Sequence, residues 1–103
     1  MLGPTGHVDT FARDNLPPPQ AWPMFRLDGY AYPEWLNAAV ELTDRMVEKG
    51  FGDNVALIGN GRRRTYKELT DWSNRLAHAL VADYGVRPGN RVLIRSGNNP
   101  AMV

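Results

Sequence analysis

Apolar and polar positions from Val55 onward follow the spacing of a β-hairpin that leads into a helix. Val55–Ile58 is a short apolar run, Gly59-Asn60-Gly61 follows it, and Arg62–Tyr66 is a second strand-like segment. An Asn-Gly pair between two such segments favours the tight turns that join antiparallel strands. We therefore expect a hairpin over residues 55–66, with the arginine run in its second arm.

Thr65 and Glu68 predict where the following helix begins. Their T-x-x-E spacing is that of a capping box, in which each side chain accepts a hydrogen bond from the other residue's backbone N–H. The helix should continue until Tyr84-Gly85, because glycine is typical of a helix end. Its apolar residues recur at steps of three and four and predict a buried stripe, made of Leu69, Trp72, Leu76, Ala77, Leu80 and Val81.

The residues after this helix predict a turn and a buried strand. Pro88 and Gly89 suit the two central places of a type II turn. Val92–Ile94 is apolar at every position, which is typical of a strand covered on both faces by helices. The helix would then connect the hairpin to this strand as a crossover connection. The pattern therefore indicates an α/β fold in which this chain supplies part of a sheet: a β-hairpin, a helix and a strand.

A second amphipathic helix is predicted between Glu34 and Lys49. Pro33 precedes it and Gly50 follows it, as expected for a helix start and a helix end. Glu41 and Arg45 are four residues apart, so they should form a favourable pair on its exposed side. The apolar positions of this segment recur every three to four residues, at Leu36, Ala39, Val40, Met46 and Val47.

Residues 1–33 precede these elements as a proline-rich leader. Six of the eight prolines lie at or before Pro33, so this segment cannot be a regular helix or a central strand. We interpret it as an extended leader whose apolar anchors dock on a partner surface; a partly ordered tail is the alternative. The anchors are Leu16, Trp22, Met24 and Phe25.

The last residues of the sequence predict the start of another helix. Asn99 suits the N-cap and Pro100 the first helical position, yet only Ala101, Met102 and Val103 follow. Such a short segment is an unfavourable helix nucleus. We therefore expect residues 34–103 to be an incomplete N-terminal part of a larger domain.

Composition and charge narrow the function classes. The chain has 103 residues, of which 43% are hydrophobic and 22% charged, as in ordinary globular proteins. A net charge of +1 disfavours a nucleic-acid or membrane-surface partner. The absence of cysteine and the presence of two histidines disfavour disulfides, thiolate chemistry and a zinc site. No signal peptide or membrane span is evident, so we expect a cytoplasmic location.

Two segments of the hairpin have the residue types of a phosphate site, and each has a plainer explanation. Gly59-Asn60-Gly61 lacks the remaining residues of a phosphate-binding loop and is expected to be a turn. Arg62, Arg63 and Arg64 could contact phosphate or RNA, but neighbouring side chains of a strand point to opposite faces. A solvated edge strand is therefore the favoured interpretation.

Two further groups have the residue types of a functional site. Ser73 and His78, with Asp71 or Asp83, contain the types needed for a nucleophile, a base and an orienting acid. Five residues correspond to about 140° around a helix, so Ser73 and His78 should not meet. The loop 96–99 joins the predicted strand to a helix start, where free N–H groups can bind an anion. A simple cap and turn is favoured there.

Taken in order, these segments resemble the start of the adenylate-forming acyl-CoA synthetase family. Asn90 stands where the family most often has aspartate, in a turn away from the chemistry. The leader over residues 7–19, with Trp22-Pro23 after it, is similar to the benzoate and 2-aminobenzoate CoA ligase branch. The segments that carry the family resemblance are VALI at 55–58, RTYKEL at 64–69, NRLAHAL at 74–80, GVRPGNRV at 85–92 and NNP at 98–100.

The resemblance implies an enzyme that activates a carboxylic acid, in this branch an aromatic one. With ATP and Mg²⁺ it forms an acyl-adenylate and pyrophosphate, and it then transfers the acyl group to coenzyme A. The family's Ser/Thr/Gly-rich loop ending in Pro-Lys, its Tyr-x-Thr-Glu segment, its ribose-binding aspartate and its catalytic lysine have no match here. We therefore assign no catalytic, cofactor-binding or metal residue, and expect this chain alone to be inactive and to bind none of these cofactors.

Two alternatives stay open. A free-standing small α/β binding module could share the pattern, and about 100 residues are enough to bury a core. A basic nucleic-acid binder would instead use Arg62–Arg64 as part of a larger cationic surface.

Overall fold

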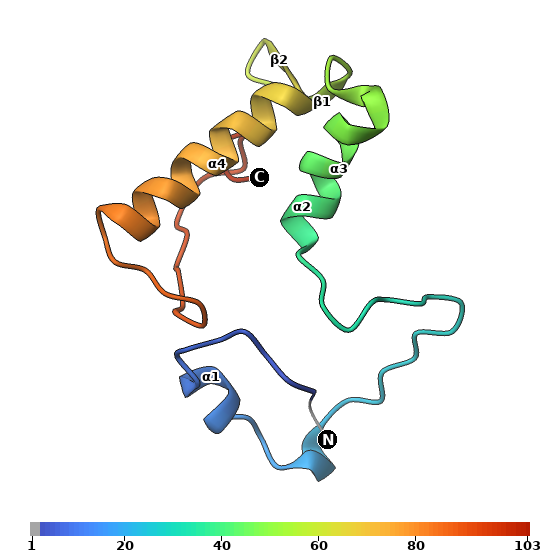
Figure 1. Cartoon of the computed structure of the whole chain (residues 1–103), viewed down its shortest axis with the longest axis vertical. Helices are drawn as coiled ribbons and strands as arrows, with labels where there is room; N and C mark the ends of the chain where they lie inside the picture. The colour runs from blue at the N-terminus through green and yellow to red at the C-terminus, as the bar shows by residue number, and fades with distance from the viewer. Residues whose placement is uncertain (1–2) are drawn as a thin grey trace. The chain divides into compact units, whose positions relative to one another are not determined.

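The computed structural model describes residues 3–103, and the chain forms two compact units. Unit 1 contains the residues up to Leu36 together with Arg87–Arg91; unit 2 contains Asn37–Val86 and Val92–Val103. Figure 1 labels the α-helices and β-strands along the chain. In order they are α1 (Phe11–Asp14), η1 (Pro19–Ala21), α2 (Ala38–Leu42), α3 (Asp44–Met46), η2 (Val47–Phe51), β1 (Val55–Gly59), β2 (Arg62–Thr65) and α4 (Tyr66–Ala82).

The predicted hairpin is confirmed. Strands β1 and β2 pair antiparallel, with Leu57 opposite Arg64 and Gly59 opposite Arg62. Asn60 and Gly61 have φ values of 52° and 72°, the left-handed conformation that an Asn-Gly turn between twisted strands requires. The register shifts between Val55 and Leu57, so β1 carries a bulge near the point where the hairpin meets the helix.

The predicted capping box at the start of α4 is also confirmed. Thr65 Oγ1 accepts a hydrogen bond from the Glu68 N–H at 3.2 Å, and Glu68 Oε2 accepts one from the Thr65 N–H at 2.8 Å. The first two N–H groups of the helix have partners in the preceding loop. Those of Tyr66 and Lys67 donate to the carbonyls of Asn54 and Gly52, at 3.1 and 2.9 Å. The helix start is therefore hydrogen-bonded to both the hairpin and the loop before it.

Helix α4 ends at Ala82, just before the predicted Tyr84-Gly85 boundary. Gly85 has φ 64°, and the Val86 N–H donates to the Leu80 carbonyl at 3.0 Å. The left-handed glycine turns the chain back on the helix, so that the Val86 N–H reaches a carbonyl of its last turn, which explains why glycine follows the helix.

The single helix predicted over Glu34–Lys49 is wrong in its start and in its continuity. It begins at Ala38, where the Asn37 side chain accepts a hydrogen bond from the Val40 N–H. It breaks at Thr43, whose hydroxyl donates to the Ala39 carbonyl at 2.8 Å, a bond that commonly bends helices. The chain continues as α3 and the π-helical turn η2, which contains Gly50 at φ 86°. The predicted Glu41–Arg45 pair is present at 3.5 Å.

The leader is less uniformly extended than predicted. It contains the short helix α1 and the 3₁₀ turn η1, joined by irregular backbone. Helix α1 follows Thr10, whose hydroxyl donates to Asp14 at 2.6 Å. Trp22 also has a local partner, since its indole N–H donates to the Pro17 carbonyl at 2.7 Å. Prolines stop these turns from growing into longer helices.

The strand predicted over Val92–Ile94 is absent from the structure. These residues have irregular backbone, and in the described part of the chain the sheet consists of β1 and β2 alone. Leu93 is 93% exposed. A strand exists only when a neighbour pairs with it, and no segment of residues 3–103 does so here. The α/β character therefore rests on the hairpin and the helices, without the crossover to a third strand.

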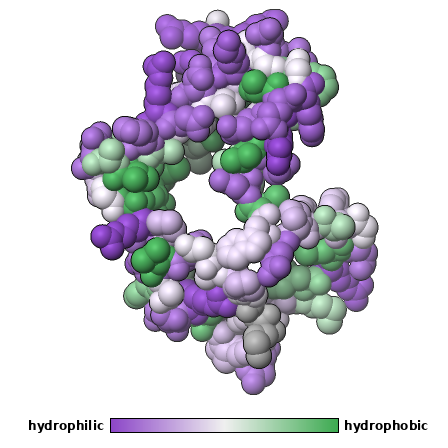
Figure 2. Space-filling model, viewed as in Figure 1, coloured by the Kyte–Doolittle hydropathy of each residue, from purple (hydrophilic) through white to green (hydrophobic). Residues whose placement is uncertain are grey.

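No hydrophobic side chain among the described residues is fully buried. Figure 2 shows hydrophobic residues at the surface in several separate patches. The buried stripe predicted for α4 is consequently wrong for this chain, since Leu76 is 58% exposed and Val81 63% exposed. Pro100, Ala101 and Val103 line a groove together with Leu69, Leu76 and Leu80 of this face.

Replacing Thr65 with alanine should weaken the start of α4. The variant loses the hydroxyl that accepts the Glu68 N–H, which costs helix caps about 1 kcal/mol. We expect faster hydrogen exchange at the Glu68 amide and lower helicity by circular dichroism. Ser73→Ala is the matched control, because alanine favours the middle of a helix and should hold or raise helicity. Equal exchange at Glu68 in T65A and the parent chain would contradict the cap's role.

Candidate functional site

Gly59-Asn60-Gly61 is a turn and shows no geometry of a phosphate-binding loop. It connects β1 to β2, and the positive φ values of Asn60 and Gly61 serve the hairpin turn. The structural interpretation of this motif is therefore confirmed.

The three arginines of β2 separate onto two faces, as strand alternation predicts. Arg62 and Arg64 lie opposite Gly59 and Leu57 and line the same hollow, whereas Arg63 lies opposite Ile58. The Arg64 guanidinium carbon lies 4.7 Å from the centre of the Trp72 ring, a cation–π contact that holds its position. Two of the three cations thus share one surface of unit 2.

The hollow beside Arg62 and Arg64 has a volume of about 370 Å³. It lies between the hairpin, the first turns of α4 and the turn at Asn99-Pro100. Its lining holds two guanidinium groups and no carboxylate, so its electrostatics favour an anionic or uncharged hydrogen-bond acceptor. It contains no nucleophile and no general base, so the hollow offers binding chemistry without catalytic groups.

The residue types of a catalytic triad are present on α4 but are not assembled. Ser73 lines a groove beneath Pro100 and Val103, while Asp71 lines a different hollow with Arg64 and Arg75. His78 is exposed on the same helix. Ser73 and His78 lie five residues apart on α4, which corresponds to about 140° around the helix.

The loop 96–99 ends in the predicted cap. Asn99 Oδ1 accepts a hydrogen bond from the Ala101 N–H at 2.9 Å, and its carbonyl accepts one from Met102 at 3.0 Å. Its side-chain amide donates to Ser96 Oγ at 3.1 Å. The polar groups of this loop are thus used in a local turn, which confirms the cap interpretation.

The described residues contain no group of three or more histidine, cysteine, aspartate and glutamate side chains placed to hold a metal ion. In the same range, no helix has both the length and the apolar character needed to cross a bilayer.

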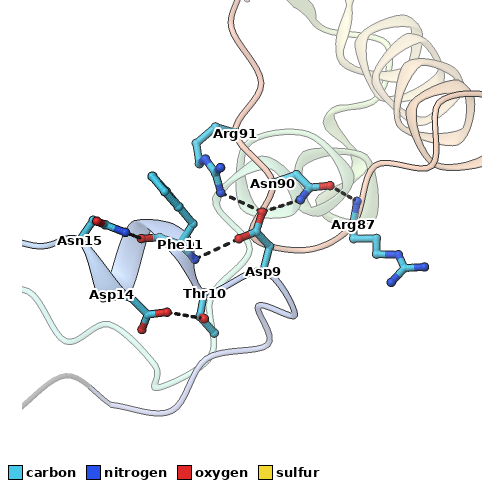
Figure 3. Close-up of polar contacts among 8 residues, drawn as sticks. All are labelled: Asp9, Thr10, Phe11, Asp14, Asn15, Arg87, Asn90 and Arg91. Carbon is cyan, nitrogen blue, oxygen red and sulfur yellow. Dashed lines mark hydrogen bonds and ion pairs between the residues drawn. The ribbon is translucent and has the colours of Figure 1, made fainter.

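Sequence reasoning missed a polar cluster in unit 1 (Figure 3). Asp9 Oδ2 accepts hydrogen bonds from Asn90 Nδ2 at 2.7 Å and from Arg91 Nη1 at 2.8 Å. The other oxygen, Oδ1, accepts the Phe11 N–H at 3.0 Å. We call Asp9, Asn90 and Arg91 the Asp9 clasp. No local pattern signals it, because the partners are more than 80 residues apart in the sequence.

The backbone reinforces the clasp. The N–H groups of Val8 and Asp9 both donate to the Pro88 carbonyl, at 2.9 and 3.0 Å. This carbonyl belongs to the predicted type II turn. The turn is confirmed, because Gly89 has φ 95° and the Asn90 N–H donates to the Arg87 carbonyl at 3.0 Å. Side-chain and backbone bonds thus join the same two segments.

The clasp stabilises the charged form of Asp9. The hydrogen bond from the Phe11 N–H lowers the pKa of this carboxyl below its ordinary value of 3.8, and the Asn90 amide and the Arg91 charge lower the pKa further. The Arg91 guanidinium carbon also lies 4.4 Å from the centre of the Phe11 ring, so the cation is held between a carboxylate and an aromatic face.

Comparison with known proteins places the chain in a family. The sequence pattern of the family described as AMP-binding enzyme matches residues 44–103. This range includes the hairpin, α4 and the residues that follow, which make up most of unit 2. The chain belongs to this family of adenylate-forming enzymes, as the resemblance of its motifs implied.

Curated relatives are CoA ligases and synthetases. The chain is 38% identical over 68 residues to 3-hydroxybenzoate–CoA ligase of Aromatoleum sp. (strain CIB), a match that covers 66% of this chain and 13% of the relative. It is 42% identical over 64 residues to acetyl-coenzyme A synthetase of Streptomyces coelicolor, covering 57% of this chain and 10% of the relative. The chain therefore spans about an eighth of the length of the first of these. No solved structure matches it.

Alanine at Gly59 should displace the turn at Asn99-Pro100 from the hairpin. A β-carbon at residue 59 would overlap Pro100 Cγ and lie 3.0 Å from Pro100 Cδ. Overpacking of this kind costs about 1–3 kcal/mol, and the short turn can relieve it by moving away. We expect loss of the nuclear Overhauser contacts between residue 59 and Pro100, with the hairpin contacts retained.

Gly97→Ala is the control, since no atom lies within 4 Å of a β-carbon built there. If G59A keeps its contacts with Pro100 and G97A behaves the same way, the close approach does not constrain residue 59.

Acid should open the Asp9 clasp below the ordinary aspartate pKa. Because folding lowers the pKa of Asp9, its contribution is present above pH 3.8 and is lost as the pH falls through the lower, folded value. Carbon-13 NMR of the carboxyl group should give a titration midpoint below 3.8, together with a parallel change at the Arg91 side chain. A midpoint at or above 3.8 would contradict the observed hydrogen bonding.

Proposed function

We propose that the chain is the N-terminal part of an ATP-dependent CoA ligase. In this proposal residues 1–33 form the leader, and residues 34–103 begin the AMP-binding ligase domain. The intact enzyme would convert a carboxylate and ATP into an acyl-adenylate and pyrophosphate, and then pass the acyl group to coenzyme A. The observation that carries the proposal is the AMP-binding match over residues 44–103, supported by relatives named as CoA ligases and synthetases.

An aromatic acid is the proposed substrate class. The relatives include ligases named for 3-hydroxybenzoate and for 3-hydroxybenzoate and 4-hydroxybenzoate, and the leader is similar to the benzoate branch. Identity alone does not separate the substrates, because the acetyl-coenzyme A synthetases match at 42% over a slightly shorter stretch. The leader is therefore the feature that favours an aromatic acid and, with it, a role in aromatic acid metabolism. A cytoplasmic location belongs to the proposal on the separate ground that no signal peptide is evident.

The 103 residues alone are proposed to be inactive. ATP, Mg²⁺ and coenzyme A would bind the intact enzyme, since the family's phosphate loop and catalytic lysine have no counterpart in this sequence. Without such groups the charge that develops during adenylation has no stabilising partner. An independent binding module is the weaker candidate, because the described chain buries no hydrophobic side chain as a core of its own.

Pyrophosphate exchange into ATP tests the proposal. The assay compares the complete product of the reading frame that contains this chain with the 103-residue chain, using benzoate, 2-aminobenzoate, 3-hydroxybenzoate and acetate. We expect Mg²⁺-dependent exchange from the complete product, with kcat/KM at least about tenfold higher for an aromatic acid than for acetate. The 103-residue chain should give no exchange and no ATP-dependent rise in Tm.

The outcomes separate the parts of the proposal. A preference for acetate would overturn the aromatic substrate and keep the ligase. An absence of exchange with every acid would overturn the ligase itself. Exchange by the 103-residue chain would show that its own residues suffice for catalysis.

A further inference from the structure

The side chain of residue 90 must both accept one hydrogen bond and donate another. Asn90 Oδ1 accepts the Arg87 N–H at 2.8 Å and so closes the turn around Pro88 and Gly89. This bond orients the side-chain amide, leaving Nδ2 to donate to Asp9 Oδ2 at 2.7 Å. Asparagine satisfies both requirements at once (Figure 3).

Aspartate at the same position would satisfy only the first requirement. It could accept the Arg87 N–H, but it has no donor for Asp9 when ionised. A carboxylate oxygen would then stand where Asn90 Nδ2 now stands, within hydrogen-bond distance of the Asp9 carboxylate. Two carboxylates so placed repel each other, and the single cation Arg91 cannot compensate both.

The amide contributes specificity that the ion pair does not. The side chains of Arg91 and Asp9 are 53% and 28% exposed, and an ion pair that solvent reaches adds little by itself. The bond from the Asn90 amide to the carboxylate, at 2.7 Å, and the two backbone bonds to the Pro88 carbonyl add to the attachment and fix its geometry.

We infer that Asp9 and Asn90 are a matched pair that fastens the leader to the turn at Pro88-Gly89. Asp9 lies outside residues 44–103, the range of the family match, whereas Asn90 lies inside it. The pair therefore attaches a segment outside the family match to a turn inside it. Asparagine at residue 90, unlike aspartate, makes this attachment compatible with an acid at residue 9.

Hydrogen exchange at the Val8 and Asp9 amides measures the attachment, since both N–H groups donate to the Pro88 carbonyl. The experiment uses the full 103-residue chain and the variants N90A, N90D, D9N and D9N/N90D. We expect exchange about threefold faster in N90A, which loses the donor to Asp9 and the acceptor for the Arg87 N–H, and about tenfold faster in N90D, which keeps that acceptor and adds repulsion. In the double variant the residue 9 amide can donate to the residue 90 carboxylate, which removes the repulsion, while Arg91 loses its acceptor on residue 9. Exchange should therefore be slower than in N90D and within about threefold of the parent chain.

Asp14→Asn is the matched control. Asp14 is also an acid of the leader, but it accepts its hydrogen bond from Thr10, inside the leader. Exchange at Val8 and Asp9 should therefore stay within about twofold of the parent chain. The amide of residue 90 reports the turn separately, because it donates to the Arg87 carbonyl. It should stay protected in N90D if the attachment is lost and the turn survives.

Three results at the Val8 and Asp9 amides would overturn the inference. They are parental exchange in N90D, equal acceleration in N90A and N90D, and a double variant that exchanges as fast as N90D or faster. The inference would also be overturned if exchange in N90D accelerated as much at the residue 90 amide as at the Val8 and Asp9 amides, because asparagine would then serve the turn alone. None of these outcomes depends on ligase activity.

Discussion

The junction at Thr65 is the interaction on which unit 2 depends. Thr65 is the last residue of β2 and the N-cap of α4, so one residue ends the hairpin and begins the helix. The capping box satisfies the N–H groups of Thr65 and Glu68. The N–H groups of the two residues between them donate to the carbonyls of Asn54 and Gly52. Hydrogen bonds therefore set the direction in which α4 leaves the hairpin, without help from a buried core.

The apolar surface is the complementary constraint. Trp72, Leu76 and Val81 lie on α4 at helical spacing, yet they remain 38%, 58% and 63% exposed. Hydrophobic burial is the main favourable term in folding, so a described chain without buried hydrophobic side chains relies on local hydrogen bonds, turns and caps. In the proposed ligase, the remainder of the domain would cover this stripe.

Unit 1 is held together by different means. Its leader is rich in proline and lacks long helices, so regular backbone bonding contributes little. The Asp9 clasp supplies the long-range attachment instead, through a carboxylate that accepts from the Phe11 N–H, the Asn90 amide and the Arg91 guanidinium. One acidic side chain in an otherwise irregular segment thus defines where the leader meets the rest of its unit.

Local chemistry in the sequence was enough to determine the hairpin, the capping box, the Pro88-Gly89 turn and the Asn99 cap. Each depends on residues within four positions of one another, where side-chain type directly restricts backbone conformation. The same reasoning separated Arg63 from Arg62 and Arg64, because alternation along a strand is a local property.

Tertiary structure alone decided the features that need a distant partner. The apolar run Val92–Ile94 has strand character, but a strand forms only where another segment pairs with it. The break at Thr43 depends on the hydrogen bond from its hydroxyl to the Ala39 carbonyl, and the helical spacing of apolar residues does not reveal that bond. Asp9 and Asn90 meet across 81 residues, a contact that no periodicity encodes because it depends on how the backbone folds between them.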